Sequence, residues 1–180
     1  MDADERLRLF VALPLPPEPR ELLVAWQSRG LGAAGDARIV PPENLHVTLA
    51  FLGSRPRSDV VAILDALRAA AADVHPPTLR STRYRETRSV GMVVLDDEGG
   101  RATRLAADLG EQLAALGVYR PERRPWLPHV TVLRFRRPPR LSPEPPDLGE
   151  VSPSEAALYT SSLRRSGAQY DVLESVPLGG

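Results

Sequence analysis

Two short segments of the sequence carry the same His-Val-Thr motif, and their side chains could perform acid–base chemistry. The first is His46–Thr48 and the second is His129–Thr131, so the two histidines lie 83 positions apart (129 − 46). The chain contains three histidines and seven threonines. With this composition, two His-x-Thr patterns arise by chance with a probability of roughly 0.5%. Chance alone therefore does not account for the repetition.

Apolar residues alternate with the motif residues as in a β-strand, where residues i and i+2 point to the same side. His46 would share a face with Thr48, and His129 would share a face with Thr131. Four apolar residues would fill the opposite, buried face: Val47, Leu49, Val130 and Val132. If the two strands lie side by side or face to face, two imidazoles and two hydroxyls meet at one site.

This set of groups is suited to opening a cyclic phosphate. One neutral imidazole can take a proton from water, and one imidazolium can give a proton to the leaving ribose oxygen. Hydroxyl donors can hold the non-bridging oxygens. Histidine suits both roles because its usual pKa of about 6.5 allows both protonation states near neutral pH. His46 and His129 are therefore the candidate catalytic residues, with Thr48 and Thr131 as phosphate-binding residues.

A purely structural role or a metal site accounts less well for the two motifs. A half-buried histidine bonded to a neighbouring threonine accounts for one motif but gives no reason for a second. A metal site would need more ligands, and neither motif contains Asp, Glu or Cys. We therefore expect neither a metal nor another cofactor.

The apolar pattern predicts strands and helices that interleave along the chain. Helices are expected over 17–30, 59–72 and 101–116, with Asp59 as an N-cap and Leu116 on a buried stripe. The strand that begins at Leu45 should end before Gly53. The proline-rich stretch 136–153 should be a loop. The expected strands are 6–15, 37–40, 45–52, 79–84, 91–95, 129–135, 156–163 and 170–176.

Because strands outnumber helices, we expect an α+β fold with mixed or antiparallel sheets. The spacing of the motifs is close to half of the 180 residues. It suggests a duplicated lobe whose second copy faces the first across a pseudo-twofold axis. Residues 1–180 would then form a single domain of two interleaved lobes.

Composition narrows the class of protein. The formal net charge is zero, with 23 basic and 23 acidic residues, so any contact with nucleic acid should be local. No apolar run is long enough to cross a membrane, and the N-terminus lacks the features of a secretory signal. The chain has no Cys. We expect a cytoplasmic monomer that binds neither DNA nor membranes.

Arginines and aromatic residues are candidates for contacts with RNA. All 23 basic residues are arginines, which indicates genome composition as much as selection for phosphate binding. Tyr84 and Trp126 could stack a base, whereas strand alternation puts Phe51 in the core. His75 lies in a proline-bounded loop and should be solvated. Three Arg-rich segments could line an RNA groove: 80–88, 120–124 and 134–140.

Several blocks of the sequence resemble the two-histidine phosphoesterases. The similar branch is that of the bacterial and archaeal RNA 2′,3′-cyclic phosphodiesterases, also called 2′-5′ RNA ligases. The most specific block is 39–53, IVPPENLHVTLAFLG, and the second is 126–134, WLPHVTVLR. The opening strand at 8–13 and the closing hairpin at 158–163 and 170–173 are also similar. The resemblance covers nearly the whole chain.

The resemblance implies two pseudo-symmetric lobes of mostly antiparallel sheet, with helices outside and a central catalytic groove. It also implies metal-independent opening of 2′,3′-cyclic phosphates at RNA ends, including ends of tRNA fragments, to 2′-phosphates. Some relatives also join RNA ends reversibly through a 2′-5′ linkage. His46 would protonate the departing 3′ oxygen, and His129 would activate water.

Two further residues enter as substrate-binding candidates, Trp126 beside the second motif and Arg134 after it. Arg134 matches the family's arginine, five positions beyond His129. Strict alternation would point Arg134 away from the histidines, so it reaches a phosphate only if the strand ends or bulges there. The chain departs from the family at 79–88, which is polar and Arg-rich where the family usually has Gly and Phe.

Two alternatives stay open at this point. One is a related phosphodiesterase that acts on a small cyclic nucleotide or on an ADP-ribose cyclic phosphate. The other is a non-catalytic module of the same fold that binds RNA or a nucleotide. Comparing a cyclic mononucleotide with a cyclic-ended oligonucleotide separates the first from RNA-end hydrolysis, and the two intact motifs argue against the second.

Overall fold

A computed structural model describes residues 5–32 and 35–179, and within these the chain forms strands, three α-helices and two short 3-10 helices. The helices are α1 (Pro17–Gly30), α2 (Val60–Ala71) and α3 (Arg101–Ala115), and the 3-10 helices are η1 (Pro42–Asn44) and η2 (Arg57–Asp59). The strands are β1 (Arg6–Pro14), β2 (Arg38–Ile39), β3 (His46–Pro56), β4 (Thr78–Glu86), β5 (Val90–Glu98), β6 (His129–Arg134), β7 (Glu155–Arg164) and β8 (Gly167–Pro177).

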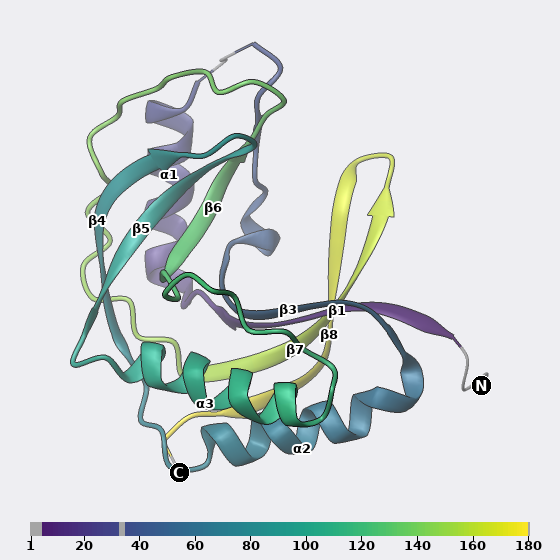
Figure 1. The fold of residues 1–180 in the computed structure, drawn as a ribbon. Helices are drawn as coiled ribbons and strands as arrows, with labels where there is room; N and C mark the ends of the chain where they lie inside the picture. Colours follow the sequence, from purple (N-terminus) through teal and green to yellow (C-terminus); the bar gives the residue numbers. More distant parts are fainter. Residues whose placement is uncertain (1–4, 33–34, 180) are drawn as a thin grey trace.

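One curled antiparallel sheet runs through both halves of the molecule (Figure 1). Its strand order is β4-β5-β6-β3-β1-β7-β8. The short strand β2 lies outside this order and pairs with the end of β6, on the edge opposite β5. The segments β1–α1–β3 and β5–α3–β6 repeat the same strand–helix–strand order around the central pair β3 and β6. The structure thus confirms the predicted α+β fold built from two related lobes.

The helices α1 and α3 do not cover the strands of their own repeat. Although α1 belongs to the first repeat, it packs behind the second, where the Gln27 side-chain amide donates to the Val132 carbonyl oxygen at 3.0 Å. The Trp26 ring lies against Tyr84 of β4, with ring centroids 6.1 Å apart. The helices α2 and α3 lie together under the lobe formed by β3, β1, β7 and β8 (Figure 1). The helix of the first repeat therefore packs against strands of the second.

The main apolar core lies between the helices and one face of the sheet. Val47, Leu49, Val130 and Val132 all belong to it, as strand alternation predicts. A smaller apolar cluster lies apart from this core: Phe10, Ala12, Ala157 and Tyr159, with Tyr170 packed against it. We call the sheet face that carries the histidines and threonines of the two motifs the site face.

Three local predictions were wrong. The strand β3 continues through Gly53 to Pro56, because Gly53 adopts a φ of +70° inside the strand and Leu52 is left without a partner in β1. Asp59 makes no capping bond and instead accepts from the Arg55 guanidinium at 2.8 Å. Leu116 lies beyond the end of α3 and is 46% exposed.

The proline-rich stretch after β6 is a loop, as predicted, but it is firmly attached. Val151 exchanges two backbone hydrogen bonds with Leu79, at 2.9 and 2.8 Å. The Trp26 indole donates to the Glu144 carbonyl oxygen at 2.8 Å. The loop therefore packs along β4 and α1.

No helix among the described residues is long and apolar enough to cross a membrane.

Candidate active site

The two motifs meet where β3 and β6 lie side by side. Val47 pairs directly with Val130 in the antiparallel ladder. Extending this register by one residue in each direction brings His46 beside Thr131 and Thr48 beside His129. All four are partly buried, whereas Val47 and Val130 are fully buried on the opposite face. The antiparallel pairing of the two motif strands agrees with the pseudo-twofold relation expected from the repeat.

A backbone carbonyl fixes the orientation of each imidazole. His46 Nδ1 donates to the Asn44 carbonyl oxygen at 2.8 Å, and His129 Nδ1 donates to the Leu127 carbonyl oxygen at 2.7 Å. Because a carbonyl oxygen can only accept, Nδ1 carries the proton in both rings and Nε2 is left for chemistry. In His46, Nε2 accepts from the Thr48 hydroxyl at 3.0 Å.

The surroundings of His46 are aromatic. Its ring stacks on Phe10, with centroids 5.0 Å apart, and meets the edge of Tyr170 at 5.5 Å. Tyr159 lies 6.3 Å away. Burial lowers the pKa of His46 from 6.5 to about 4; the Asn44 carbonyl opposes this shift, and Coulombic interactions with Arg134 and His129 add to it. His46 is therefore a neutral imidazole at neutral pH in the unliganded protein.

Asn44 connects this site to the closing hairpin. It is buried in the 3-10 helix η1, and its side-chain amide donates to the Ala168 carbonyl oxygen of β8 at 2.9 Å. Its own carbonyl oxygen holds His46. Reasoning from the motifs alone missed Asn44 and the ring neighbours of His46. The only signal for them in the sequence was their position within the blocks that resemble the family.

A β-bulge brings Arg134 to the site face. Gly91 of β5 pairs with Leu133 of β6, but the next residue, Met92, pairs with Thr131, so Val132 is an extra residue. Val132 and Leu133 are consequently both buried, and Arg134 is exposed. The charge of Arg134 acts on His46. The strict alternation that would have pointed Arg134 away from the histidines does not hold here.

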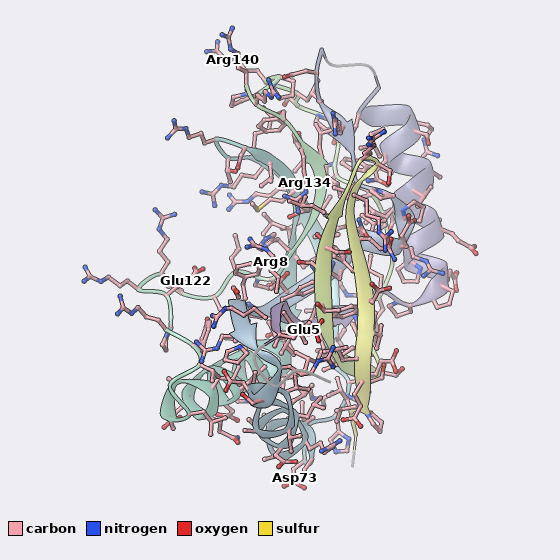
Figure 2. All side chains as sticks on the ribbon, turned by 90° about the vertical axis from the view of Figure 1, so that its right-hand side faces the viewer. Glu5, Arg8, Asp73, Glu122, Arg134 and Arg140 are labelled. Carbon is pink, nitrogen blue, oxygen red and sulfur yellow. The ribbon has the colours of Figure 1, made fainter. Side chains whose placement is uncertain are left out.

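A β-bulge also occurs in β3, and because of it the prediction that Phe51 lies in the core is wrong. Thr48 pairs with Ala12 and Ala50 pairs with Val11, so Leu49 is the extra residue. Phe51 is 51% exposed instead of buried in the core. It lies five positions beyond His46, as Arg134 lies five beyond His129. The Arg8 guanidinium lies 4.9 Å from the centre of the Phe51 ring, and Figure 2 shows Arg8 and Arg134 in the middle of the molecule.

Trp126 and Tyr84 have structural contacts. The Trp126 indole donates to the Thr48 carbonyl oxygen at 3.1 Å and so joins the loop before β6 to β3. A contact between Trp126 and a base stays a prediction. Tyr84 packs on Trp26 and bonds to Glu86, so its ring lies on the face of the sheet opposite the two motifs.

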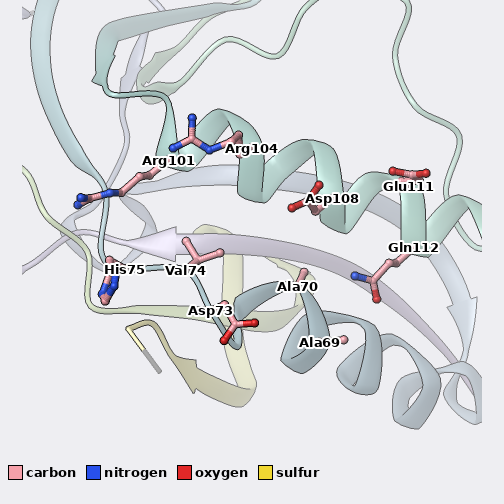
Figure 3. A pocket seen from close by; sticks show the side chains of 10 residues that line it. All are labelled: Ala69, Ala70, Asp73, Val74, His75, Arg101, Arg104, Asp108, Glu111 and Gln112. Carbon is pink, nitrogen blue, oxygen red and sulfur yellow. The ribbon is translucent and has the colours of Figure 1, made fainter.

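The third histidine is not brought to the motifs. His75 lines a cavity of about 510 Å³ between α2 and α3, together with residues such as Arg101 and Asp108 (Figure 3). None of the residues that line it belongs to either motif. Within residues 5–32 and 35–179, no group of three or more His, Cys, Asp or Glu side chains could hold a metal ion.

Comparison with known proteins agrees with this geometry. Residues 13–87 match the family model described as LigT like Phosphoesterase. An RNA 2′,3′-cyclic phosphodiesterase of Thermus thermophilus is 37% identical over 97% of this chain and 91% of its own length. One of Escherichia coli is 31% identical over 94% of this chain and 96% of its own.

Solved structures show the same fold. The structure of TT0787 of Thermus thermophilus has a TM-score of 0.81 at 32% identity, covering 96% of this chain and 98% of that one. That of E. coli LigT complexed with 3′-AMP has a TM-score of 0.82 at 30% identity, covering 98% and 100%. The protein is therefore a two-histidine phosphoesterase in architecture. It belongs to the LigT-like phosphoesterases, the family of RNA 2′,3′-cyclic phosphodiesterases.

Proposed function

We propose that this protein hydrolyses 2′,3′-cyclic phosphates at RNA ends to 2′-phosphates, with His46 and His129 as the acid–base pair. The observation that carries this proposal is the shared orientation of the two rings. Each imidazole is held through Nδ1 by the carbonyl two residues before it, which leaves both Nε2 atoms for proton transfer. The names of the relatives from T. thermophilus and E. coli support the same activity.

The reaction moves one proton through each histidine. Nε2 of the base takes a proton from water, and the water oxygen forms a bond to phosphorus. The P–O3′ bond breaks, and Nε2 of the acid delivers a proton to O3′. The Thr131 hydroxyl would donate to a non-bridging oxygen, where negative charge builds up. The Thr48 hydroxyl would do the same once His46 Nε2 is protonated and no longer accepts from it. No other reactant is consumed.

The family resemblance makes His46 the acid and His129 the base. Since the pKa of His46 is about 4 without ligand, His46 can act as the acid only if it gains a proton when substrate binds. An anionic phosphate beside the ring favours the charged imidazolium and so raises the pKa. The assignment thus requires proton uptake that is coupled to substrate binding.

Arg134 and Phe51 would complete the substrate site. Arg134 offers a charged donor to the phosphate from the β6 side, because the bulge turns it to the site face. Phe51 offers an exposed ring on the β3 side, on which a nucleobase can stack. The E. coli relative that was solved complexed with 3′-AMP supports binding of a nucleotide by this fold.

We further propose that the protein acts on RNA, such as tRNA fragments, as a cytoplasmic monomer of one domain. A 2′,3′-cyclic phosphate requires a ribose 2′-hydroxyl, so DNA cannot supply this substrate. Reversible 2′-5′ ligation would use the same two histidines, with a 5′-hydroxyl of RNA in place of water.

A single product analysis tests the activity. An oligonucleotide that ends in a 2′,3′-cyclic phosphate is incubated with the protein in excess EDTA, with His46→Ala/His129→Ala as the inactive control. We expect a 2′-phosphate, which a strictly 3′-specific phosphatase leaves intact. A cyclic mononucleotide or an ADP-ribose cyclic phosphate hydrolysed with much higher kcat/KM would instead favour a small-molecule phosphodiesterase. If none of these cyclic phosphates is hydrolysed, the proposal is refuted.

A further inference from the structure

The two sides of the pseudo-symmetric site differ sharply in chemistry. On the β1 side, the site face carries the cluster of Phe10, Ala12 and Tyr159, with Tyr170 beside it. On the β5 side, two strands from the central pair, β4 contributes Arg83 and Arg85. One side is aromatic and the other is cationic. The side chains therefore make the two ends of the site different, although the backbone around them is pseudo-symmetric.

The strand registers place both arginines on the site face. Arg83 pairs with Val94, and Val94 pairs with His129. Arg85 pairs with Met92, and Met92 pairs with Thr131. Residues paired across neighbouring strands point to the same face of a sheet. Because neighbouring strands lie about 4.8 Å apart, the two arginines start about 10 Å from the second motif.

Tyr84, which lies between these arginines, checks the register. It pairs with Val93, which pairs with Val130 in the core. Its ring accordingly contacts Trp26 of α1 on the opposite face. Arg83 and Arg85 are both exposed, as expected for side chains on the side away from α1.

These arginines carry charges that the protein does not neutralise. Among the described residues, neither Arg83 nor Arg85 makes an ion pair or a side-chain hydrogen bond. Arg80 on the same strand differs, because Glu98 and Glu150 each lie 3.7 Å from its guanidinium. Guanidinium groups that have no acidic partner keep their donors available for phosphate oxygens.

We propose that the RNA chain upstream of the cyclic phosphate crosses β5 and β4, with Arg83 and Arg85 binding its internucleotide phosphates. This inference rests on the proposed function. A terminal cyclic phosphate leaves only one direction for the rest of the chain, toward its 5′ side. The arginine side offers charge to a nucleic-acid backbone, whereas the aromatic side is buried around His46 and offers none.

The test compares two substrates, a nucleoside 2′,3′-cyclic phosphate and a short oligonucleotide with the same cyclic end. The readout is the ratio of their kcat/KM values, and the variant is Arg83→Gln/Arg85→Gln. We expect the ratio to fall about tenfold, because each lost phosphate contact weakens transition-state binding of the longer substrate only. The salt dependence of kcat/KM for the oligonucleotide should become shallower.

Arg80→Gln is the matched control, since it removes one charge from the same strand where acidic partners already neutralise that charge. It should leave the ratio unchanged. The proposal is overturned if the wild type does not prefer the oligonucleotide, or if the double variant keeps the wild-type ratio and salt dependence.

A binding measurement separates this inference from the proposed function. Fluorescence anisotropy with a 2′-phosphate-ended oligonucleotide needs no turnover. If the wild type hydrolyses neither substrate but binds this RNA, and the double variant binds it more weakly, then the arginine surface stands and the hydrolytic function fails. If hydrolysis is normal and the double variant binds as tightly as the wild type, then the arginine surface fails alone.

Discussion

His46 and His129 are equivalent in backbone position but not in environment. Each ring is held by the carbonyl of the residue two positions before it. Within the part of the chain that the structure describes, aromatic rings enclose His46 but not His129, and the pKa of His46 falls to about 4. The duplicated motif therefore supplies two similar groups, and the side chains around them make the groups chemically different.

Removing either motif histidine should nearly abolish turnover. His46→Ala and His129→Ala should each reduce kcat by about 10²-fold or more, because positioned proton transfer contributes about 10²–10⁴. The double variant should be little worse than the worse single variant, since the pair acts as a unit. His75→Ala, in the separate cavity between α2 and α3, is the matched control and should retain activity. A single motif variant with near-normal turnover would remove that histidine from the pair.

The buried neutral His46 should also make stability depend on pH. Its pKa is about 4 in the folded protein and 6.5 when unfolded, so acid protonates the unfolded state first. This contribution is complete above pH 6.5 and is lost as the pH falls toward 4, by at most about 3 kcal/mol. Urea unfolding at several pH values should show a smaller acid loss for His46→Ala than for the wild type. Equal losses would mean that His46 is not protected from protonation.

The assignment of acid and base has its own test. Replacing the departing 3′ oxygen of the substrate by sulfur removes the need for an acid, because a thiolate leaves unassisted. The substitution should rescue His46→Ala far better than His129→Ala. If the rescue favoured His129→Ala, the roles would be exchanged, in agreement with the neutral state of His46 in the free protein.

At the scale of elements, two β-bulges decide which side chains join the site. Each motif strand has one extra residue just after its threonine, Leu49 in β3 and Val132 in β6. Two neighbouring residues are buried as a result, and the next side chain, Phe51 or Arg134, turns to the site face. A bulge depends on the hydrogen bonds to a partner strand, which the apolar pattern of one strand does not encode. For this reason alternation placed the histidines and threonines correctly but misplaced Phe51 and Arg134.

A glycine allows β3 to continue past its bulge. Gly53 has a φ of +70°, and a Cβ atom there would lie 3.9 Å from the Phe51 ring. Gly53→Ala should lower the free energy of unfolding by about 1–2 kcal/mol, the usual cost of a left-handed conformation. Gly32→Ala is the control, because Gly32 has no positive φ and no atom within 4 Å of its Cβ position. Chemical denaturation of both variants measures the difference in the free energy of unfolding. Equal stabilities would show that a side chain at position 53 causes no strain.

For the whole molecule, the sequence predicted the helices, the strands and the central position of the two motifs. It predicted less well how the halves are assembled. The ring of His46 is enclosed by residues from β1 and from the closing hairpin of β7 and β8, which lie near opposite ends of the described chain. Likewise, α1 covers the opposite lobe through Gln27. Periodicity describes one segment at a time, whereas these contacts depend on which segments pack together.

Catalysis should not depend on a metal ion, because the proposed histidines supply both proton transfers. Hydrolysis of the cyclic-ended oligonucleotide should therefore persist in excess EDTA at a rate close to that of the untreated protein. A loss of turnover that a divalent cation restores would refute the two-histidine mechanism. Wild-type protein treated with EDTA and then dialysed provides the reference for damage by the chelator.

The pairing of β1 with β7 also affects how the protein folds. Phe10 of β1 is aligned with Tyr159 of β7. The outer edge of β1, near the start of the described chain, is therefore covered only after β7, near its end, has formed. Such non-local pairing has a large loop-closure cost and makes folding slow. During synthesis, β1 and β3 can associate early, but their outer edge stays open until the closing hairpin emerges. The enclosure of His46 is thus among the last features to form, and catalytic competence coincides with the protection of this edge from aggregation.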